Sequence, residues 1–301
     1  MKKVQVLLSS YNGEKYIKEQ LESILNQQGV EVHCLIRDDG STDSTLEILN
    51  EFKLSNKNIE SIEGENIGYQ RSFMELVSLS SDFDYYAFAD QDDIWLPNKL
   101  IKSIEMLTCY DNNIPLLYHS NAQVVNSKLE YMYKLRDTDP FKEVEKRFLL
   151  NGFVLGCTSI FNHSAKKIVL KSDIDFKIAH DFWIPILCVL FGTVVYDSNS
   201  YILYRQHDGN IYGSKNGFFQ MFKSRCKEFF KSENLYEKTS KALLAGYVDI
   251  LEISDLQMIK EVACYRDSLL RKIKLIFSTQ SMKSSFRGTV YVKLAVLFSK
   301  I

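Results

Sequence analysis

The sequence predicts an α/β fold in which a Rossmann-like mixed sheet is flanked by helices and followed by a helical C-terminal extension. In the first half of the chain, short β-branched and aliphatic runs alternate with segments whose apolar residues recur at helical spacing. Loops rich in aspartate, asparagine and glycine follow these runs. Sheets of this kind bind their ligands at the carboxyl ends of the strands, so the loops are the first place to look for a site.

The opening unit is a strand expected at Val4–Leu8 and a helix expected at Glu14–Gln28. The pattern then repeats, with strands at Val32–Ile36, Ile59–Ile62 and Tyr85–Ala89. Because the carboxyl ends of parallel strands meet at one edge of a sheet, we expect the four following loops to converge on one crevice. Their candidate residues are Tyr11, Asp38 and Asp39, Asn66 to Gly68, and Asp90 to Asp93.

After Pro97 the pattern becomes mixed and does not determine the order of strands. Further strands are expected at Leu116–Tyr118, Ala122–Val125, Thr158–Phe161, Val194–Tyr196 and Ser200–Tyr204, with helices at Phe141–Leu150 and Asp181–Phe191. A basic amphipathic helical pattern then runs from Phe218 to Phe230. We therefore expect one domain at residues 1–214 and a basic helical extension at residues 215–301.

The composition is that of an ordinary globular protein, and a formal net charge of −1 argues against a dedicated nucleic-acid binder. The charge is uneven, with 16 Lys and Arg against 8 Asp and Glu in residues 215–301. Six cysteines without a CxxC pair fit a reducing compartment, and no uncharged run has the length of a membrane span. We expect a cytoplasmic protein whose basic extension contacts the inner face of the membrane, forms a homodimer or packs on the first domain.

The strongest local signal is Asp90-Gln91-Asp92-Asp93, which directly follows the apolar run Tyr85–Ala89. Crowded carboxylates repel one another unless a cation neutralises them, and clusters rich in oxygen suit Mg²⁺ or Mn²⁺, which in turn clamp a diphosphate. The cluster therefore predicts a metal and nucleotide site. The alternative is an acidic turn that caps a helix beginning near Pro97.

Two earlier loops are compatible with the same site. The segment Ser9–Glu14 places Tyr11 after the first strand, where its ring could lie beside a base, although a turn that caps the next helix explains it equally well. Asp38 and Asp39 end the second strand and offer a carboxylate to the imide N–H of a pyrimidine, or else only cap a helix. Three such loops at one edge are harder to explain as coincident caps.

The motifs SSYNGE, DDGSTD, ENIGYQ and ADQDD stand in the order and spacing of the family 2 glycosyltransferases with the GT-A fold, over about residues 1 to 210. FADQDDIW, HDFW and YRQH resemble the subgroup that contains bacterial rhamnosyltransferases of cell-wall, capsule and O-antigen assembly. The resemblance implies an inverting transfer, in which an acceptor hydroxyl attacks the anomeric carbon and a nucleoside diphosphate leaves. It also implies Mn²⁺ or Mg²⁺ as a Lewis acid at the departing diphosphate.

The resemblance further assigns residues to roles. Contacts with the nucleotide sugar fall on Ser9, Tyr11, Glu14, Asp38, Asp39, Asn66, Gly68, Arg71, Asp90 and Arg205. The metal ligands fall on Asp92 and on His207, which ends the segment Tyr204–His207, with Asp93 as a supporting group. In the family two asparagines usually follow such a histidine, and Asp208 and Gly209 stand there in this chain. This departure leaves the geometry of a closing segment open.

The transfer also needs a general base, because an alcohol is a poor nucleophile until its proton can leave. In this family an acidic pair ending in Asp commonly provides it, and here the pair is His180-Asp181. We assign Asp181 as the base and His180 as a supporting residue; a dry environment beside Trp183 would raise the pKa of the carboxyl group from its usual value of about 3.9. The alternatives are that Asp181 only favours the dipole of its helix, or that His180 is the base.

We therefore expect an enzyme that moves rhamnose from dTDP-rhamnose to a lipid-linked glycan precursor. The loops do not separate uridine from thymidine, so a UDP-hexose or UDP-N-acetylhexosamine transferase with the same site stays open. A catalytically silent subunit that binds a nucleotide sugar or glycan is the rival from another class, and the presence of both Asp92 and Asp181 argues against it. A nucleotidyltransferase would need a glycine-rich, basic loop, whereas Ser9–Glu14 contains one glycine and no arginine.

Overall fold

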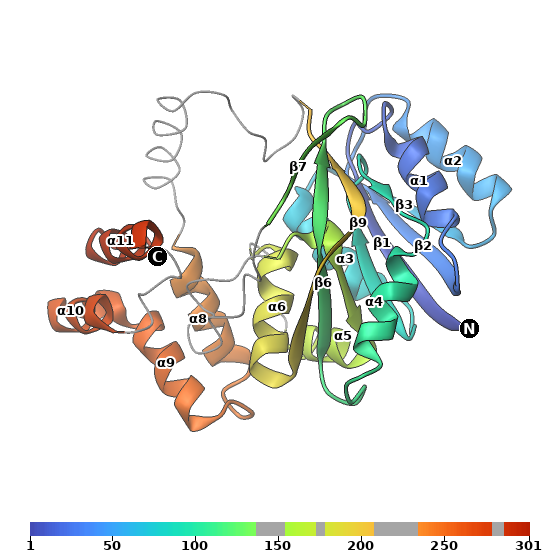
Figure 1. The fold of residues 1–301 in the computed structure, drawn as a ribbon. Coiled ribbons are helices and arrows are strands. Elements are labelled where there is room, and N and C mark those ends of the chain that lie inside the picture. Colours follow the sequence, from blue (N-terminus) through green and yellow to red (C-terminus); the bar gives the residue numbers. More distant parts are fainter. Residues whose placement is uncertain (137–153, 173–177, 208–233, 279–285) are drawn as a thin grey trace. The chain divides into compact units, whose positions relative to one another are not determined.

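The computed structural model describes residues 1–136, 154–172, 178–207, 234–278 and 286–301 (Figure 1). The chain divides into two compact units. The first unit, which contains the sheet, ends at His207. The helix expected at Phe141–Leu150, the amphipathic pattern from Phe218 to Phe230 and the expected boundary between residues 214 and 215 lie outside the described residues.

Within the described part of the chain, the first unit contains one mixed sheet of nine strands. The strands are β1 (Lys2–Ser10), β2 (Val30–Asp38), β3 (Ile59–Glu63), β4 (Tyr85–Ala89), β5 (Ile94–Trp95), β6 (Leu116–Val125), β7 (Tyr131–Lys134), β8 (Ser159–Asn162) and β9 (Thr193–Arg205). Their order in the sheet is β3-β2-β1-β4-β8-β6-β9-β5, and β7 pairs with β6 beside this path. The expected α/β fold with a mixed sheet is confirmed.

The first half of the sheet is parallel: β1 pairs with β2 and β4, and β2 pairs with β3. The second half is mixed, because β8 runs antiparallel to both β4 and β6 while β9 runs parallel to β6. The two-residue strand β5 is antiparallel to β9. The carboxyl ends of β1, β2, β4, β6 and β9 therefore lie at the same edge of the sheet.

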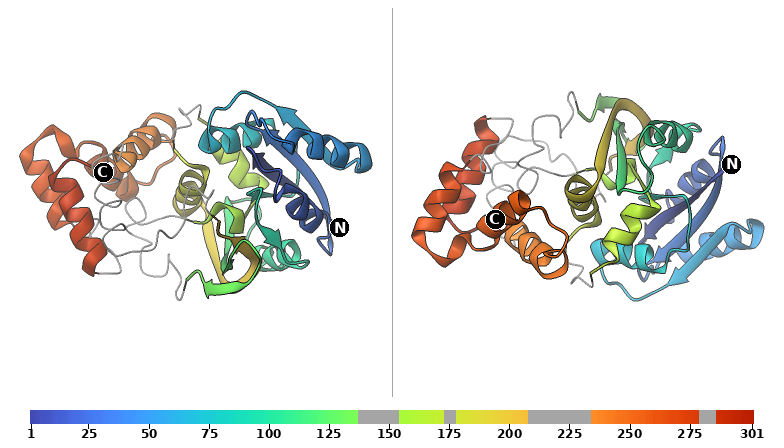
Figure 2. Two further views of the ribbon diagram at one scale, coloured as in Figure 1. Left: turned by 90° about the horizontal axis from the view of Figure 1, so that it is seen from above. Right: turned by 90° about the horizontal axis from the view of Figure 1, so that it is seen from below.

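Helices cover both faces of this sheet (Figures 1 and 2). They are α1 (Ile17–Leu25), α2 (Thr45–Ser55), α3 (Tyr69–Leu79), α4 (Lys99–Leu107), α5 (His163–Val169) and α6 (His180–Phe191), with a short turn η2 (Gly156–Thr158). Side chains alternate along β4, so Ala87 and Ala89 join the core formed with α1, α2 and α4, whereas Phe88 contacts Phe73 of α3 and His180 of α6. Burying each large apolar side chain contributes about 1.5–3 kcal/mol.

Two pairs of expected strands are single long strands in the structure. Leu116–Tyr118 and Ala122–Val125 are both part of β6, and the two segments expected between Val194 and Tyr204 are both part of β9. The polar residues between the segments read as breaks, but they are paired: the side chain of Asn121 donates to Tyr196 Oη at 3.2 Å, and Tyr118 Oη donates to Asp197 Oδ2 at 3.1 Å. The register of β6 with β9 shifts at Asn121, which absorbs the irregularity.

The second unit is helical, as expected for the C-terminal extension. It contains α8 (Leu235–Gly246), α9 (Ile253–Ala263), the turn η3 (Tyr265–Asp267), α10 (Leu269–Phe277) and α11 (Phe286–Leu297). Its core includes Leu243, Ile259, Val262, Tyr265 and Leu275, each no more than 1% exposed. In the part of the chain that the structure describes, no helix is both long and apolar enough to cross a bilayer.

Candidate active site

Asp38 holds together the loops that follow the first two strands. Its carboxylate is 1% exposed and accepts hydrogen bonds from Ser10 Oγ at 2.8 Å, from Ser41 N at 2.7 Å and from Ser41 Oγ at 2.6 Å. Glu14 acts similarly, since its Oε2 accepts from Ser44 N at 2.9 Å, just before α2. Both carboxylates therefore shape the edge of the sheet, and a direct contact of either with a nucleotide stays a prediction.

Asp39 joins the second loop to the third. Its carboxylate is buried, accepts from Ile67 N and Gly68 N at 2.9 Å each and is paired with the Arg37 guanidinium. Gly68 has a φ of 84°, a conformation that side chains other than glycine rarely adopt, so the loop can turn both amides toward Asp39. Sequence reasoning missed Arg37, which also donates to Glu75 Oε2 at 2.9 Å. Contact of Asp39 with a base stays a prediction.

Tyr11 presents an exposed aromatic ring at this edge, with 47% of the residue accessible. Its backbone is held by the acidic loop, because Tyr11 N donates to Gln91 Oε1 at 2.8 Å and Gln91 Nε2 donates back to Tyr11 O at 3.0 Å. The Ser9 hydroxyl lies 2.7 Å from that of Ser72 in α3. The other predicted residues of the third loop and of α3, Asn66 and Arg71, are exposed.

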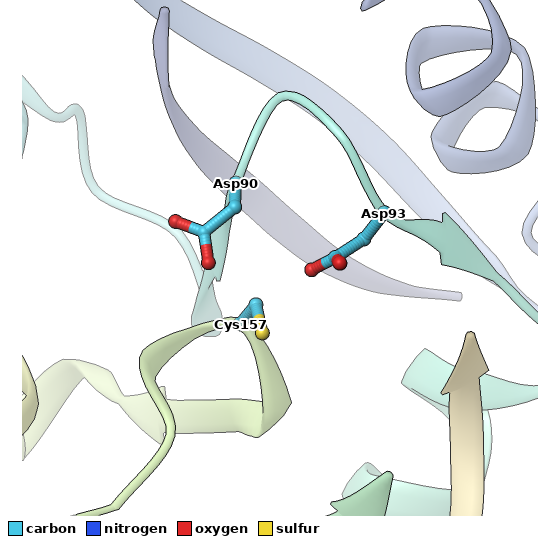
Figure 3. Close-up of side chains that lie close together, drawn as sticks. All are labelled: Asp90, Asp93 and Cys157. Carbon is cyan, nitrogen blue, oxygen red and sulfur yellow. The ribbon is translucent and has the colours of Figure 1, made fainter. Parts of the chain in front are cut away.

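The acidic loop after β4 brings two carboxyl groups and a thiol together (Figure 3). One ligand atom from each of Asp90, Asp93 and Cys157 lies within 4.8 Å of the others. Burial raises the pKa of Asp90 to about 7, and the charges of Asp92 and Asp181 add to the shift. Burial, followed by the charges of Asp92 and Asp90, also raises the pKa of Asp93 well above its usual range. The loop is thus a place where negative charge is poorly compensated.

Lys99, the first residue of α4, is 1% exposed and interacts electrostatically with Asp93 of this loop. Its Nζ is 3.6 Å from the centroid of the Trp95 ring, and burial lowers its pKa to about 7. Within the described residues, neither Lys99 Nζ nor Asp93 Oδ2 has a hydrogen-bond partner. Sequence reasoning missed Lys99, because a lysine in an amphipathic helix is usually exposed.

The segment at the end of β9 lies against the acidic loop. His207 Nε2 is 2.9 Å from Asp92 Oδ2, and the His207 ring packs 4.8 Å from that of Tyr16. Arg205 is 3% exposed and donates from Nε to Asp92 O at 2.9 Å, pairs with Glu19 and lies over the Tyr16 ring. The structure thus uses Arg205 to hold the loop, and the predicted contact of Arg205 with a diphosphate would require one of these bonds to be given up.

The residues at this edge fit a divalent cation. Asp92 and His207 place a carboxylate oxygen and an imidazole nitrogen side by side. Burial and the neighbouring charges raise the pKa values of Asp90 and Asp93, and a bound cation would stabilise the ionised form of both carboxyl groups. Oxygen ligands with one imidazole suit Mn²⁺ or Mg²⁺. Cys157 is a poorer ligand, because burial raises the pKa of its thiol well above its usual value and keeps it protonated.

His180 is a packing residue in this structure. It is 4% exposed, and its ring centroid lies 4.1 Å from that of Phe73 and 4.4 Å from that of Phe88. Burial lowers the pKa of His180 to about 3, so the ring holds a proton only weakly, which disfavours the alternative in which His180 is the base. Gly156 leaves space for the ring, since a Cβ there would lie 2.4 Å from His180 Nε2.

Asp181, in the first turn of α6, has the properties of a general base. Burial raises its pKa to about 6, and among the described residues its buried Oδ1 has no hydrogen-bond partner. Its charge is also felt by Asp90, which places the two carboxyl groups near one another. A carboxylate with a pKa near neutrality and an unoccupied oxygen can accept a proton from a substrate.

A mixed sheet with an Asp-x-Asp loop and a candidate base at its carboxyl edge defines a GT-A type glycosyltransferase. Residues 5–170 match the sequence pattern of Glycosyl transferase family 2, and the chain belongs to this family. The chain is 29% identical to dTDP-rhamnosyl transferase RfbG of Shigella flexneri, over 72% of this chain and 77% of that protein. It is 31% identical to the Escherichia coli enzyme WfgD, a UDP-Glc:alpha-D-GlcNAc-diphosphoundecaprenol beta-1,3-glucosyltransferase, over 41% of this chain and only 47% of that enzyme.

Solved structures show the same fold. Residues 1–349 of S. aureus TarS, in complex with UDP, superpose with a TM-score of 0.58 at 18% identity, covering 93% of this chain and 75% of that one. The mannosyltransferase PcManGT from Pyrobaculum calidifontis, in complex with GDP-Man and Mn²⁺, gives a TM-score of 0.51 at 13% identity, covering 99% of this chain and 88% of that one. These likenesses confirm the expected GT-A fold.

Proposed function

We propose that this glycosyltransferase transfers rhamnose from dTDP-rhamnose, with inversion, to a lipid-linked glycan precursor of a bacterial surface polysaccharide. The observation that carries the proposed chemistry is the unoccupied carboxylate oxygen of Asp181, whose pKa is raised to about 6, near the acidic loop. It supplies a base on the acceptor side of a site whose other side suits a nucleoside diphosphate. The choice of donor is supported by the likeness to the Shigella dTDP-rhamnosyl transferase.

In the proposed reaction the acceptor oxygen forms a bond to the anomeric carbon on the face opposite the departing diphosphate. Asp181 accepts the proton of the attacking hydroxyl, and the bond between the anomeric carbon and the diphosphate oxygen breaks with its electron pair. Tyr11 lies against the base with its exposed ring, while Asp38 and Asp39 hold the loops that frame it. Asn66 and Arg71 line the donor from the third loop and the start of α3.

Asp92 and His207 would hold Mn²⁺ or Mg²⁺, with Asp90 beside them. The bound cation supplies a Lewis acid that offsets the charge developing on the departing diphosphate. Arg205 positions the proposed ligands Asp92 and His207, because its side chain donates a hydrogen bond to the backbone of Asp92 and His207 follows it by two residues. The catalytic domain is proposed to span residues 1–214, and the extension at 215–301 to contact the membrane or a second copy of the chain.

A second candidate uses the same residues with a UDP-sugar, and the likeness to WfgD favours it. The name of that enzyme also supports an acceptor joined to a polyprenyl diphosphate, and such an acceptor would place the protein at the inner face of the cell membrane. The alternative that is not an enzyme is a catalytically silent subunit that binds a nucleotide sugar or a glycan.

The test incubates the protein and Mn²⁺ with a short-chain polyprenyl diphosphate that carries one N-acetylhexosamine, and with dTDP-rhamnose, UDP-glucose or UDP-N-acetylglucosamine in turn. The proposal expects dTDP release and a product one deoxyhexose heavier, with inverted anomeric configuration by NMR. Turnover of a UDP-sugar instead would select the second candidate. Nucleotide-sugar binding without turnover on a range of glycan acceptors would support the silent subunit.

A further inference from the structure

Helix α10 in the second unit turns its apolar side away from the core of that unit. Four large side chains are exposed on it: Leu269 (69%), Leu270 (80%), Ile273 (43%) and Phe277 (81%). With about 3.6 residues per turn, these positions form a single stripe roughly 100° wide. Leu275 lies on the opposite side of the helix and is 1% exposed, so the buried side is the one with fewer apolar residues.

The basic residues of α10 lie beside or opposite this stripe and contact the second unit. Lys272 Nζ donates to Ser299 Oγ at 2.5 Å, Lys274 Nζ lies 2.6 Å from Glu261 Oε1, and Arg271 Nη1 lies 2.6 Å from Asp267 Oδ2. A helix of a water-soluble domain normally places its apolar stripe on the core and its charges in water. The apolar stripe of α10 faces water instead, and the side chains of Arg271 and Lys274 stay more than half exposed outside it, which is the arrangement of a helix lying in the interface of a bilayer.

The charge of this part of the chain identifies the surface that α10 fits. Residues 268–301 contain seven Lys and Arg and neither Asp nor Glu. Such a segment is attracted to an anionic lipid surface, by about 1 kcal/mol per cation close to the headgroups in general. Two copies of the chain that met through this segment would bring like charges together, which disfavours a dimer as the partner.

The neighbouring helix extends the same character. α11 packs against α10 within the second unit. α11 and the residue that follows it expose a second apolar stripe made of Val290, Tyr291, Leu294, Leu297 and Phe298, each 40–58% exposed. Its other side is buried, through Val292, Ala295 and Val296. Isolated exposed apolar residues are common on protein surfaces, but two adjacent stripes mark an interaction surface.

We propose that α10 lies in the plane of an anionic phospholipid bilayer, with Leu269, Leu270, Ile273 and Phe277 inserted among the acyl chains and with Lys272 and Lys274, which flank this stripe, at the level of the headgroups. This inference deepens the proposed function and rests on it for its purpose, because a lipid-linked acceptor is presented at that surface. The binding itself requires neither donor nor turnover, so it can be tested separately.

The experiment measures sedimentation of the full chain with vesicles of phosphatidylcholine alone and of phosphatidylcholine with an equal amount of phosphatidylglycerol. We expect binding to the mixed vesicles that weakens with salt, because salt screens the cations. The double variant Leu270→Glu, Phe277→Glu changes two residues at least 80% exposed, so it leaves the core intact, and it should bind at least about tenfold more weakly. Leu54→Glu is the matched control: Leu54 is 89% exposed on α2, and this variant should bind like the parent.

A second readout reports the orientation of the helix. Phe277→Trp places an indole on the stripe, whereas both native tryptophans, Trp95 and Trp183, are 2% exposed. Its emission should shift to shorter wavelength when mixed vesicles are added. An unchanged emission, or equal vesicle binding by the parent and the double variant, would overturn the proposal.

Two further outcomes distinguish membrane binding by α10 from a dimer interface and from the proposed function. If the parent is a dimer that the double variant converts to a monomer, and neither binds vesicles, the face is an interface between copies and the proposal is wrong. Nucleotide-sugar binding is measured in parallel without lipid. Vesicle binding without any nucleotide-sugar binding would uphold the role of α10 and contradict the proposed function. Nucleotide-sugar binding without vesicle binding would contradict only the role of α10.

Discussion

Replacing Asp181 by asparagine should separate its role in catalysis from its cost to stability. The pKa of this carboxyl group is raised from 3.8 to about 6 by burial. The folded chain therefore holds the proton more tightly than the unfolded chain, so the unfavourable contribution to stability appears as pH rises between these values and is complete above pH 6. A shift of about two units corresponds to about 3 kcal/mol, which is an upper limit because asparagine also has a polar side chain to bury.

Asp181→Asn should therefore increase the free energy of unfolding by about 1–3 kcal/mol above pH 6, measured by urea denaturation in chelator, and the gain should vanish near pH 4. The same variant should lower kcat by about 10² or more while leaving the affinity for the nucleoside diphosphate nearly unchanged. The parent should lose activity as pH falls below about 6, and the variant should lack this acid limb.

Asp82→Asn is the control, because the Asp82 side chain is 87% exposed in the same unit. It should change neither kcat nor the pH profile. A decrease in stability for Asp181→Asn, or a kcat within a factor of about two of the parent, would refute the assignment of Asp181 as a buried, ionisable base.

Three further changes test the rest of the site. Asp92→Asn and His207→Ala should each raise the Mn²⁺ concentration required for half-maximal turnover, with effects that are not additive in the double variant because the two groups lie 2.9 Å apart; additive effects would place them in separate sites. Gly156→Ala should destabilise the protein by about 1–3 kcal/mol in urea denaturation, since its Cβ would lie 2.4 Å from the packed ring of His180; an unchanged midpoint would show that the ring can move. Lys99→Met removes a buried amine beside the acidic carboxyl groups and should weaken donor binding in calorimetry without changing the pH profile assigned to Asp181; unaltered binding would show that Lys99 does not support the loop.

The parallel half of the sheet could be predicted because its signals are local. Val4–Leu8 and Tyr85–Ala89 are apolar runs bounded by polar loops, and such runs form buried strands wherever they pair. The strand β5 could not be predicted, because Ile94–Trp95 is only two residues long and its pairing with Ile202 and Leu203 depends on a segment more than a hundred residues away. That pairing brings the acidic loop to the end of β9.

The same distinction holds in the site. Asp92 and His207 were expected together because the motifs around them resemble those of a known family, and the structure places them in contact. Lys99 and Cys157 were missed because their burial results from packing between distant segments, and neither belongs to a motif. Arg205 was expected at the diphosphate on account of its charge, but its bonds to Glu19 and to the backbone of Asp92 depend on the folded loop and leave no trace in the sequence.

Thermal stability in the presence of nucleotide sugars tests the central claim most directly. The parent and Asp92→Asn would each be heated with dTDP-rhamnose, UDP-glucose, UDP-N-acetylglucosamine or GDP-mannose, with and without Mn²⁺. A ligand that binds only the folded chain at about 100 times its Kd adds about 2.7 kcal/mol of stability. The account predicts stabilisation of the parent by dTDP-rhamnose when Mn²⁺ is present and little or none of Asp92→Asn. Stabilisation that is independent of Mn²⁺ and equal in both proteins would contradict the proposed metal site.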